Sequence, residues 1–245
     1  MNFLTRLLVL QRRRQTAKRL GFEFHRAGDF QVPGEIRIGS QMARLNLPAD
    51  EGTKTAVLDL LLDDCYHLQK FTGNIQTIMD VGAHAGLFSL SARLAFPNAK
   101  IHAYEPNPRM KQFYSNQASI GNFTVFDSAV GLADGKVFID FSEDSVQTRV
   151  HKGEKGEIRC VSFASAVAEL GGTVDLAKLD CEGAEWEILQ DEKTWQKVKN
   201  LTMEFHLWAG YTLDQLKGRV AQLGFKVRYA ELTGKDFGLL VAGRE

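Results

Sequence analysis

Cysteine is scarce in this chain, and its few copies are far apart. Cys65, Cys160 and Cys181 are the only cysteines among 245 residues. An odd number of widely separated cysteines fits neither a disulfide framework nor a zinc site built from paired cysteines. We therefore expect reduced thiols, most of them buried.

Long hydrophobic runs are also missing. The apolar stretch "FLTRLLVL" near the start is too short to span a membrane, is interrupted by Arg6, and has no small-residue cleavage site after it. This pattern excludes a transmembrane helix and a signal peptide, so we expect a cytoplasmic protein. With 44% hydrophobic and 24% charged residues, the composition is that of an ordinary globular protein with a sizeable core.

An excess of charge of either sign is absent as well. Thirty basic residues balance thirty acidic residues, so the net charge gives no reason to expect a nucleic-acid partner. The distribution is uneven, because residues 1–20 contain six basic residues and no acidic one. Such a basic head could contact an anionic membrane peripherally, or pack on the body of the protein or on a second subunit. The sequence leaves these partners, a homo-oligomer included, open.

An alternation of strands and helices begins at about residue 75. Short β-like runs alternate with helical patterns, which indicates an α/β fold with a mostly parallel sheet and helices on both faces. The last two runs are separated by a short turn at Gly234 and should pair as an antiparallel hairpin. In chain order the predicted strands are "TIMDVGA", "AKIHAYEP", "NFTVFDSAV", "VDLAKLD", "KNLTMEFHL", "FKVRYAEL" and "DFGLLVAG".

Two segments lie outside this alternation. Residues 1–70 combine the basic head, short β-like pieces and the helical periodicity of "TKTAVLDLLLDDCYHLQKF", and we predict an N-terminal α+β extension or lid. Residues 71–245 would then form the main domain. Inside it, Asp134-Gly135 indicates a hairpin turn, and the Gly, Glu and Lys residues that follow indicate a mobile loop in 140–160.

The most informative motif is a glycine turn, "DVGAHAG". A strand ends at Asp80, and the chain passes through Gly82, Ala83, His84 and Gly86 into a helical pattern. Glycines at such a turn let the backbone approach a ligand closely, and the following helix N-terminus offers free N–H groups. A nucleotide-like cofactor would fit there, although a tight turn with nothing bound could use the same residues.

An acid follows each of the next two predicted strands. Glu105 comes after the second strand, close to the spacing of about 20 residues at which an acid accepts hydrogen bonds from ribose hydroxyls. Asp127 follows the third strand and is placed to reach the other end of an adenosine. Together with the glycine turn, these acids favour a cofactor that contains a ribose.

Two cofactors contain such a ribose, NAD and S-adenosylmethionine. The pyrophosphate of NAD favours the form G-x-G-x-x-G, whereas this loop reads G-A-H-A-G with a bulky His84 between its glycines. A Tyr-x-x-x-Lys pair of the kind used by short-chain dehydrogenases occurs at Tyr66 and Lys70, but it precedes the glycine turn. We interpret that pair as a chance match on an amphipathic helix.

Two sequence blocks resemble a known family. "IMDVGAHAGLFSLSARLAFPNAKIHAYEPNP" followed by "KLDCEGAEWEIL" and a "MEFH" strand resembles the FkbM-type methyltransferases, a branch of the S-adenosylmethionine-dependent class I superfamily. The resemblance covers roughly residues 75–210 and implies a Rossmann-like sheet of seven strands with an inserted antiparallel hairpin. It also implies roles in cofactor binding. The residues that would line the methionine part are Asp80, Gly82, Ala83 and Gly86, while Glu105 would hold the ribose and Asp127 would approach the adenine. His84, in the same turn, would pack beside the cofactor or contact it directly.

Methyl transfer to a hydroxyl needs alignment and a base or a metal to handle the proton. Asp180 and Glu182 end the fourth strand and would point to the same side if the backbone stays extended. Glu204 and His206 share one face of the fifth strand by the same period. These four residues are the predicted catalytic groups. Glu204 and His206 could act together as an oriented general base or, with Asp180, as ligands of a divalent metal, for which no specific motif is present. Glu185 is most simply a charge at a helix start.

Three functions follow from these observations. The first is an S-adenosylmethionine-dependent methyltransferase that acts on a hydroxyl of a sugar, glycan or secondary-metabolite small molecule, the substrates to which the resembled family is linked. The second is an NAD(P)-dependent Rossmann oxidoreductase, and the third is a non-catalytic adaptor that retains the fold. The acceptor is not specified, because residues 1–70 and 140–160, which would shape its pocket, carry no recognisable motif.

Overall fold

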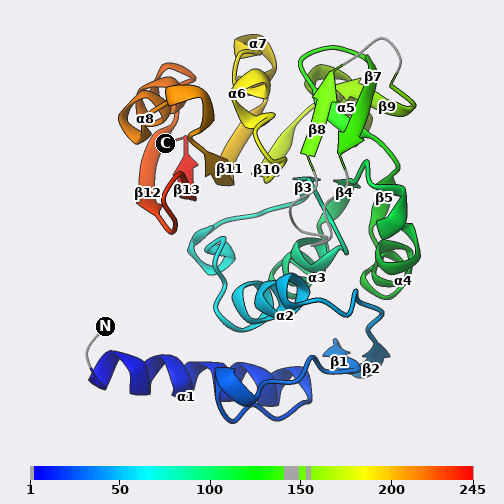
Figure 1. Cartoon of the computed structure of the whole chain (residues 1–245), viewed down its shortest axis with the longest axis vertical. Helices are drawn as coiled ribbons and strands as arrows, with labels where there is room; N and C mark the ends of the chain where they lie inside the picture. The colour runs from blue at the N-terminus through cyan, green and yellow to red at the C-terminus, as the bar shows by residue number, and fades with distance from the viewer. Residues whose placement is uncertain (1–2, 141–148, 153–155, 245) are drawn as a thin grey trace.

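The computed structural model describes residues 3–140, 149–152 and 156–244. Its centre is a seven-stranded sheet with the order β12-β13-β11-β10-β3-β4-β5, as Figure 1 shows. Every neighbouring pair is parallel except the two that involve β13. The strands are β3 (Thr77–Val81), β4 (Lys100–Tyr104), β5 (Thr124–Phe126), β10 (Val174–Leu179), β11 (Val198–His206), β12 (Lys226–Leu232) and β13 (Phe237–Gly243). The predicted fold class is therefore confirmed, including the C-terminal hairpin.

Helices cover both faces of this sheet (Figure 1). Apolar side chains pack from both sides, which explains why β10 is buried at all six positions. One face is covered by α3 (Leu87–Ala95) and α4 (Lys111–Gly121), and the other by α5 (Phe163–Leu170), α6 (Glu185–Ile188), α7 (Glu192–Trp195) and α8 (Leu213–Gln222). The largest hydrophobic cluster lies on the α5–α8 side and includes Phe163, Trp195 and Phe205.

A second, four-stranded sheet corrects two predictions. It has the order β6-β9-β7-β8 and consists of β6 (Ala129–Gly131), β7 (Gly135–Asp140), β8 (Arg149–Lys152) and β9 (Ile158–Ser162). The predicted third strand is split, since β5 stays in the main sheet and β6 leaves it. The predicted hairpin at Asp134-Gly135 is wrong, because β9 lies between β6 and β7. The Asp134 carboxylate instead accepts a hydrogen bond from the backbone N–H of Ser162 at 2.8 Å, which ties this turn to the start of α5.

The predicted mobile loop falls partly outside the described residues. Of the segment 140–160, residues 141–148 and 153–155 are not described, and the rest belongs to β7, β8 and β9 or adjoins them. Strands therefore occupy much of a region in which the sequence pattern indicated a loop.

The N-terminal extension packs below α3 in Figure 1. It consists of α1 (Phe3–Leu20), a 3-10 turn (Ala27–Asp29), the antiparallel pair β1 (Glu35–Ile38) and β2 (Gln41–Arg44), and α2 (Glu51–Val57), which runs on as a wide turn (Leu58–Leu62). Ala17 and Leu20 of α1 share a hydrophobic cluster with Leu61, Leu62 and Leu87. The extension is thus joined to the main domain by a common core.

The predicted helix "TKTAVLDLLLDDCYHLQKF" ends earlier than its periodicity indicates. Regular helix stops at Leu62, and Asp64 and His67 both adopt left-handed backbone conformations. The Asp64 carboxylate accepts hydrogen bonds from the backbone N–H groups of Leu68 and Gln69 at 2.7 and 3.1 Å. Such a local side-chain acceptor competes with the helix and starts a short 3-10 turn (Leu68–Lys70) instead. Tyr66 is therefore not on a helix, and its side chain is free to turn toward the sheet.

Candidate active site

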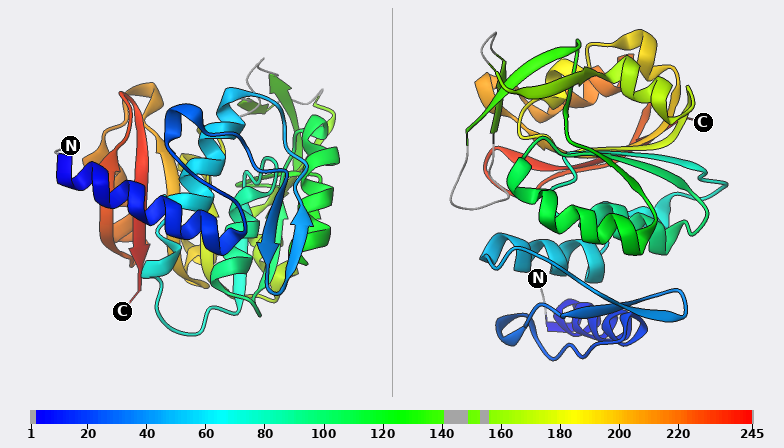
Figure 2. Two further views of the ribbon diagram at one scale, coloured as in Figure 1. Left: turned by 90° about the horizontal axis from the view of Figure 1, so that it is seen from below. Right: turned by 90° about the vertical axis from the view of Figure 1, so that its right-hand side faces the viewer.

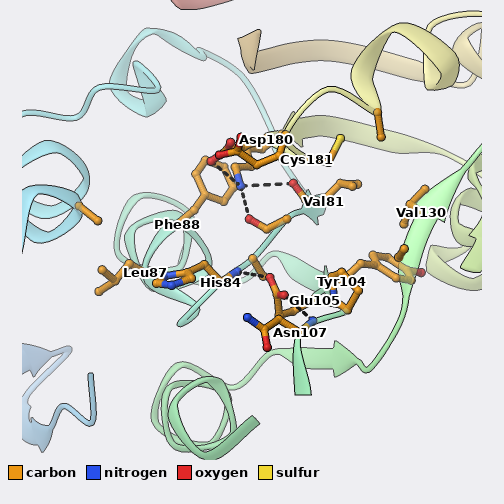
Figure 3. A pocket seen from close by; sticks show the side chains of 18 of the residues that line it. Val81, His84, Leu87, Phe88, Tyr104, Glu105, Asn107, Val130, Asp180 and Cys181 are labelled. Carbon is orange, nitrogen blue, oxygen red and sulfur yellow. Dashed lines mark hydrogen bonds and ion pairs between the residues drawn. The ribbon is translucent and has the colours of Figure 1, made fainter. Parts of the chain in front are cut away.

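A pocket lies at the carboxyl ends of β3, β4 and β10, where ligands bind in open parallel sheets. Figure 3 shows its wall from close by. One part consists of the glycine turn, the end of β4 and the start of β6, and the other part consists of the end of β10, α3 and the extension. Its lining residues are Ala56, Leu60, Tyr66, Val81, Gly82, Ala83, His84, Leu87, Phe88, Tyr104, Glu105, Pro106, Asn107, Ala129, Val130, Lys178, Asp180, Cys181, Glu182 and Ala184.

The glycine turn is held against the end of β10. Gly82 has a φ of +78°, and a Cβ atom there would lie 1.7 Å from the carbonyl oxygen of Asp180. No other residue can occupy that position without moving a strand. Gly86 also has a left-handed φ, +83°, and it directly precedes α3. The two glycines thus serve the predicted tight turn and close backbone approach.

The N–H groups of this turn already donate inside the protein. The N–H groups of Gly82 and Ala83 both donate to the carbonyl of Tyr104 at 3.0 Å, and the N–H of Gly86 donates to the carbonyl of Ala83 at 2.7 Å. The N–H of His84 donates to Glu105 Oε2 at 2.6 Å. A pyrophosphate depends on such N–H groups as donors. These four N–H groups are therefore not available as donors to a pyrophosphate.

Glu105 lies buried at the end of β4, on the pocket wall (Figure 3). Its second oxygen, Oε1, accepts from the N–H of Asn107 at 2.7 Å. Burial raises the pKa of Glu105 to about 7, although the N–H groups of Asn107 and His84 favour the ionised form. Each carboxylate oxygen can accept more than one hydrogen bond. Glu105 can therefore still receive hydroxyl donors from a ligand.

Asp80 lies beneath the pocket, not on its wall. It is fully buried, accepts a hydrogen bond from Ser89 Oγ at 2.7 Å, and lies 3.2 Å from Lys178 Nζ. Lys178, in turn, donates to the carbonyl of Gly82 at 2.5 Å. Burial alone would lower the pKa of Lys178, but Asp80 and Asp180 outweigh burial and raise it. The ion pair thus fixes the turn from below, and Asp80 supports the site without lining it.

Sequence reasoning missed Lys178. The available signal was a lysine inside the apolar run "VDLAKLD", since a buried charge is costly without a partner of opposite sign. Asp80, in the neighbouring strand and in register with Lys178, is that partner.

Asp180 is an acid of the pocket wall, across the pocket from Glu105 in Figure 3. Its Oδ2 accepts a hydrogen bond from the Tyr66 hydroxyl at 2.9 Å and lies 3.5 Å from Lys178 Nζ. Tyr66 is buried, and its ring packs edge-on against Phe88 with centroids 5.3 Å apart. The extension thus contributes a side chain to the site, although the sequence pattern offered only a chance Tyr-x-x-x-Lys match there.

Glu182 lines the pocket but belongs to a second group of charges. Its φ is +53°, so the backbone does not stay extended after β10 as the prediction assumed. His206 Nε2 lies 3.7 Å from Glu182 Oε2 and 4.0 Å from Glu204 Oε1, and His206 Nδ1 lies 3.5 Å from Glu185 Oε1. Burial would lower the pKa of His206, but Glu185, Glu182 and Asp180 outweigh burial and raise it to about 9. His206 is therefore a cation at neutral pH and not a free base.

Glu204 and His206 are brought together as predicted, but neither lines the pocket. Glu185 is more than a helix-start charge, because its carboxylate accepts from the N–H groups of Cys181 and Gly183 at 2.9 Å each. It thereby holds the turn that carries Glu182. Among the described residues, no group of three or more His, Cys, Asp or Glu residues could hold a metal ion.

Asp127 lies away from the pocket. Its half-exposed carboxylate is paired with Lys111 and accepts a hydrogen bond from the Tyr114 hydroxyl at 2.5 Å. Ala129 and Val130 occupy the pocket wall that follows β5 instead. This placement gives no support to the predicted contact of Asp127 with an adenine.

The charge on His206 predicts a pH dependence of stability. Its ordinary pKa is 6.5 and its pKa in the fold is about 9, so its stabilising contribution is complete below pH 6.5 and is lost as the pH rises through 9. The pKa of Glu204 is also raised, by burial and then by Asp180, so protonation of Glu204 acts in the same direction. We expect the free energy of unfolding to fall by about 2–3 kcal/mol between pH 6.5 and 9.5 through His206.

Urea titrations at several pH values measure this change, with His206→Gln and, as a control, His25→Gln at an exposed position. The stability difference between wild type and His206→Gln should shrink as the pH rises, and by more than that between wild type and the exposed-site control. A difference for His206→Gln that does not change with pH would contradict the assigned charge.

Comparisons with known proteins show the family to which the chain belongs. The family model described as the methyltransferase FkbM domain matches residues 80–227. The curated protein Methyltransferase sdnD of Sordaria araneosa is 25% identical over 230 residues, which cover 76% of this chain and 88% of that protein. The 31-O-demethyl-FK506 methyltransferase FkbM of Streptomyces tacrolimicus is 24% identical over 191 residues, covering 60% of this chain and 72% of that protein.

Among solved structures, TrmK of M. capricolum is similar with a TM-score of 0.49 and 11% identity, covering 76% of this chain and 70% of that one. The family match extends over more than half of the chain and includes the glycine turn, Glu105 and Asp180. This chain belongs to the FkbM family of methyltransferases.

Proposed function

We propose that this methyltransferase uses S-adenosylmethionine and methylates a hydroxyl group of a small molecule: a sugar, a glycan or a secondary metabolite. One observation carries the proposal. A single pocket presents the glycine turn with Glu105 on one part of its wall and Asp180, held by Tyr66 and Lys178, on another. A nucleoside cofactor and a hydroxyl acceptor could meet in that space.

The residues fit S-adenosylmethionine better than NAD. Glu105 offers a buried carboxylate to ribose hydroxyls, and Tyr104, Ala129 and Val130 offer an apolar wall to an adenine ring. Four N–H groups of the glycine turn are used internally, so these four cannot serve as donors to a pyrophosphate. When bound, the cofactor supplies an electrophilic methyl group on a positively charged sulfur.

Asp180 is suited to accept the proton of the acceptor hydroxyl. The ammonium group of Lys178 lies 3.5 Å from Oδ2 of this carboxylate and pairs with it. The Tyr66 hydroxyl fixes the orientation of that carboxylate through a hydrogen bond to Oδ2. Leu60, Leu87 and Phe88 give the same cavity an apolar lining. Alignment and proton removal are the two contributions that such a displacement requires from the protein.

The acceptor class is supported by one relative. The name of the Streptomyces tacrolimicus protein specifies methylation of the 31-O position of FK506, which is an oxygen atom. O-methylation by this chain would agree with the proposed role of the Asp180 carboxylate as a proton acceptor, because a hydroxyl must lose its proton during methylation. We therefore favour O-methylation.

Cofactor titration and turnover test the proposal separately. Isothermal calorimetry should show binding of S-adenosylhomocysteine and no binding of NADH. Tritiated methyl transfer from S-adenosylmethionine to a panel of hydroxylated sugars, glycans and polyketides should then identify an acceptor. NADH binding without S-adenosylhomocysteine binding would support the oxidoreductase instead. Cofactor binding without turnover on the entire panel would support the non-catalytic adaptor.

Glu105 should determine the affinity for the cofactor. The measurement is made at pH 8.5, above the pKa of about 7 of Glu105, so that its carboxylate is ionised. Replacement by glutamine removes the charge that accepts ribose hydroxyls, and hydrogen bonds to charged groups contribute about 1.5–3 kcal/mol, so we expect the Kd of S-adenosylhomocysteine to rise by about 10–100-fold. Asp127→Asn is the matched control, because Asp127 is the acid after the next strand and lies outside the pocket. It should change Kd by less than about threefold. A larger effect of Asp127→Asn than of Glu105→Gln would reverse the assignment.

A further inference from the structure

Helix α1 is the outermost element of the molecule. In Figure 2, left, the molecule is seen from below and α1 lies in front of the other elements. Its inner side is fixed to the body: Ala17 and Leu20 are buried in a core cluster, Leu10 packs against that cluster, and Arg13 is paired with Asp63. Its outer side has no such cover within the part of the chain that the structure describes.

The first two turns of α1 expose large apolar side chains. Phe3, Leu4, Leu7 and Leu8 have exposed fractions of 78%, 67%, 42% and 65%. At 100° per residue these four positions fall within an arc of about 140°, whose centre lies about 110° from Ala17 and about 170° from Leu20. Four neighbouring side chains of this size are uncommon on a surface that faces only water.

The remaining turns of the same outer side are basic. Arg14 and Lys18 fall within the same arc as the apolar residues, Arg19 lies beside it, and all three are exposed. No acidic residue occurs in the helix. The outer side of α1 therefore has an apolar half followed by a cationic half.

We propose that the outer side of α1 binds the surface of an anionic lipid bilayer. Apolar residues can enter the interface between headgroups and acyl chains, while arginine and lysine side chains pair with anionic headgroups. None of the described helices is long and apolar enough to cross a membrane, so the contact is peripheral. The helix is basic and the bilayer surface is anionic. This complementary charge is the reason why we propose a bilayer as the partner.

A second copy of the chain fits this surface less well. The apolar part of α1 is six residues long, about 9 Å of helix. A segment this short buries far less than the roughly 800 Å² of surface that each partner contributes to a stable dimer. A parallel pairing of two α1 helices would also bring the cationic halves together, and an antiparallel pairing would place each apolar half against a cationic one. Neither pairing gives a favourable partner to both the apolar half and the cationic half of α1.

Vesicle co-sedimentation of the full-length protein tests the proposal. We expect pelleting with vesicles of 70% phosphatidylcholine and 30% phosphatidylserine in 0.1 M NaCl, and binding to phosphatidylcholine alone that is weaker by at least about 25-fold. Raising NaCl to 0.5 M should weaken binding to the anionic vesicles, since the charges are then screened. The double variant Arg14→Gln/Lys18→Gln should bind them about 25-fold more weakly, at about 1 kcal/mol for each charge.

The apolar half has its own variant and control. Leu4→Glu/Leu8→Glu should reduce binding at least about tenfold without changing the melting temperature, because both side chains are exposed. Leu132→Glu/Leu232→Glu is the matched control, since these leucines are 39% and 44% exposed elsewhere on the molecule. Equal pelleting of all variants, or no pelleting of the wild type, would overturn the proposal. So would a dimer in light scattering that Leu4→Glu/Leu8→Glu dissociates while vesicle binding is absent.

Discussion

Replacement of Asp180 by asparagine is expected to slow methyl transfer by about 10²–10⁴-fold, the range that a positioned general base contributes. Asparagine has nearly the same shape and can still accept the hydrogen bond of the Tyr66 hydroxyl, but it cannot take up a proton. Its effect should therefore fall on kcat with an acceptor from the panel. The Kd of S-adenosylhomocysteine should change by no more than a few-fold.

Glu182→Gln is the matched control for this variant. Both acids line the pocket, but the carboxylate of Glu182 lies 3.7 Å from the positively charged His206, whereas Asp180 receives the Tyr66 hydroxyl. We expect a loss of less than about tenfold for Glu182→Gln. If Glu182→Gln stopped turnover and Asp180→Asn retained it, Glu182 would be the base. Calorimetry on both variants separates a loss of chemistry from a loss of cofactor binding.

Replacement of Gly82 by alanine is expected to destabilise the protein by about 3 kcal/mol or more and to abolish binding of S-adenosylhomocysteine. Two costs add. A left-handed backbone costs a residue with a Cβ about 1–2 kcal/mol, and overpacking costs typically 1–3 kcal/mol. Here the Cβ atom would lie 1.7 Å from the Asp180 carbonyl oxygen, so β3 and β10 must move apart at the pocket.

Gly39→Ala isolates the first of these costs. Gly39 has a left-handed φ of +60°, but no atom lies within 4 Å of the Cβ that alanine would add. The Gly39→Ala variant should lose only about 1–2 kcal/mol of its free energy of unfolding and should bind the cofactor normally. Chemical denaturation and calorimetry measure both quantities. An equal loss of stability in the two variants would show that backbone strain alone matters and that the close approach to Asp180 does not.

The sequence alone determined the central sheet and the turns after β3, β4 and β10 that line the pocket. Alternating apolar runs and helical patterns identified all seven strands. The central parallel strands β3 and β10 are mostly apolar because both faces of the sheet are covered, and the short turn at Gly234 marked β12 and β13 as a hairpin. The turn at Gly82 and the acids Glu105 and Asp180 were found for a related reason: residues after parallel strands meet at one edge of the sheet. This placement follows from chain direction and strand order.

Only the tertiary structure decided which of these residues act together. Tyr66 and Asp180 are 114 positions apart, and their hydrogen bond depends on a helix that ends early at Asp64. Likewise Lys178 pairs with Asp80 through strand register, and this contact turns a predicted cofactor residue into a support beneath the pocket. Local patterns report the burial and direction of one segment. Contacts between distant charged groups depend on how the segments pack, and that is a property of the whole fold.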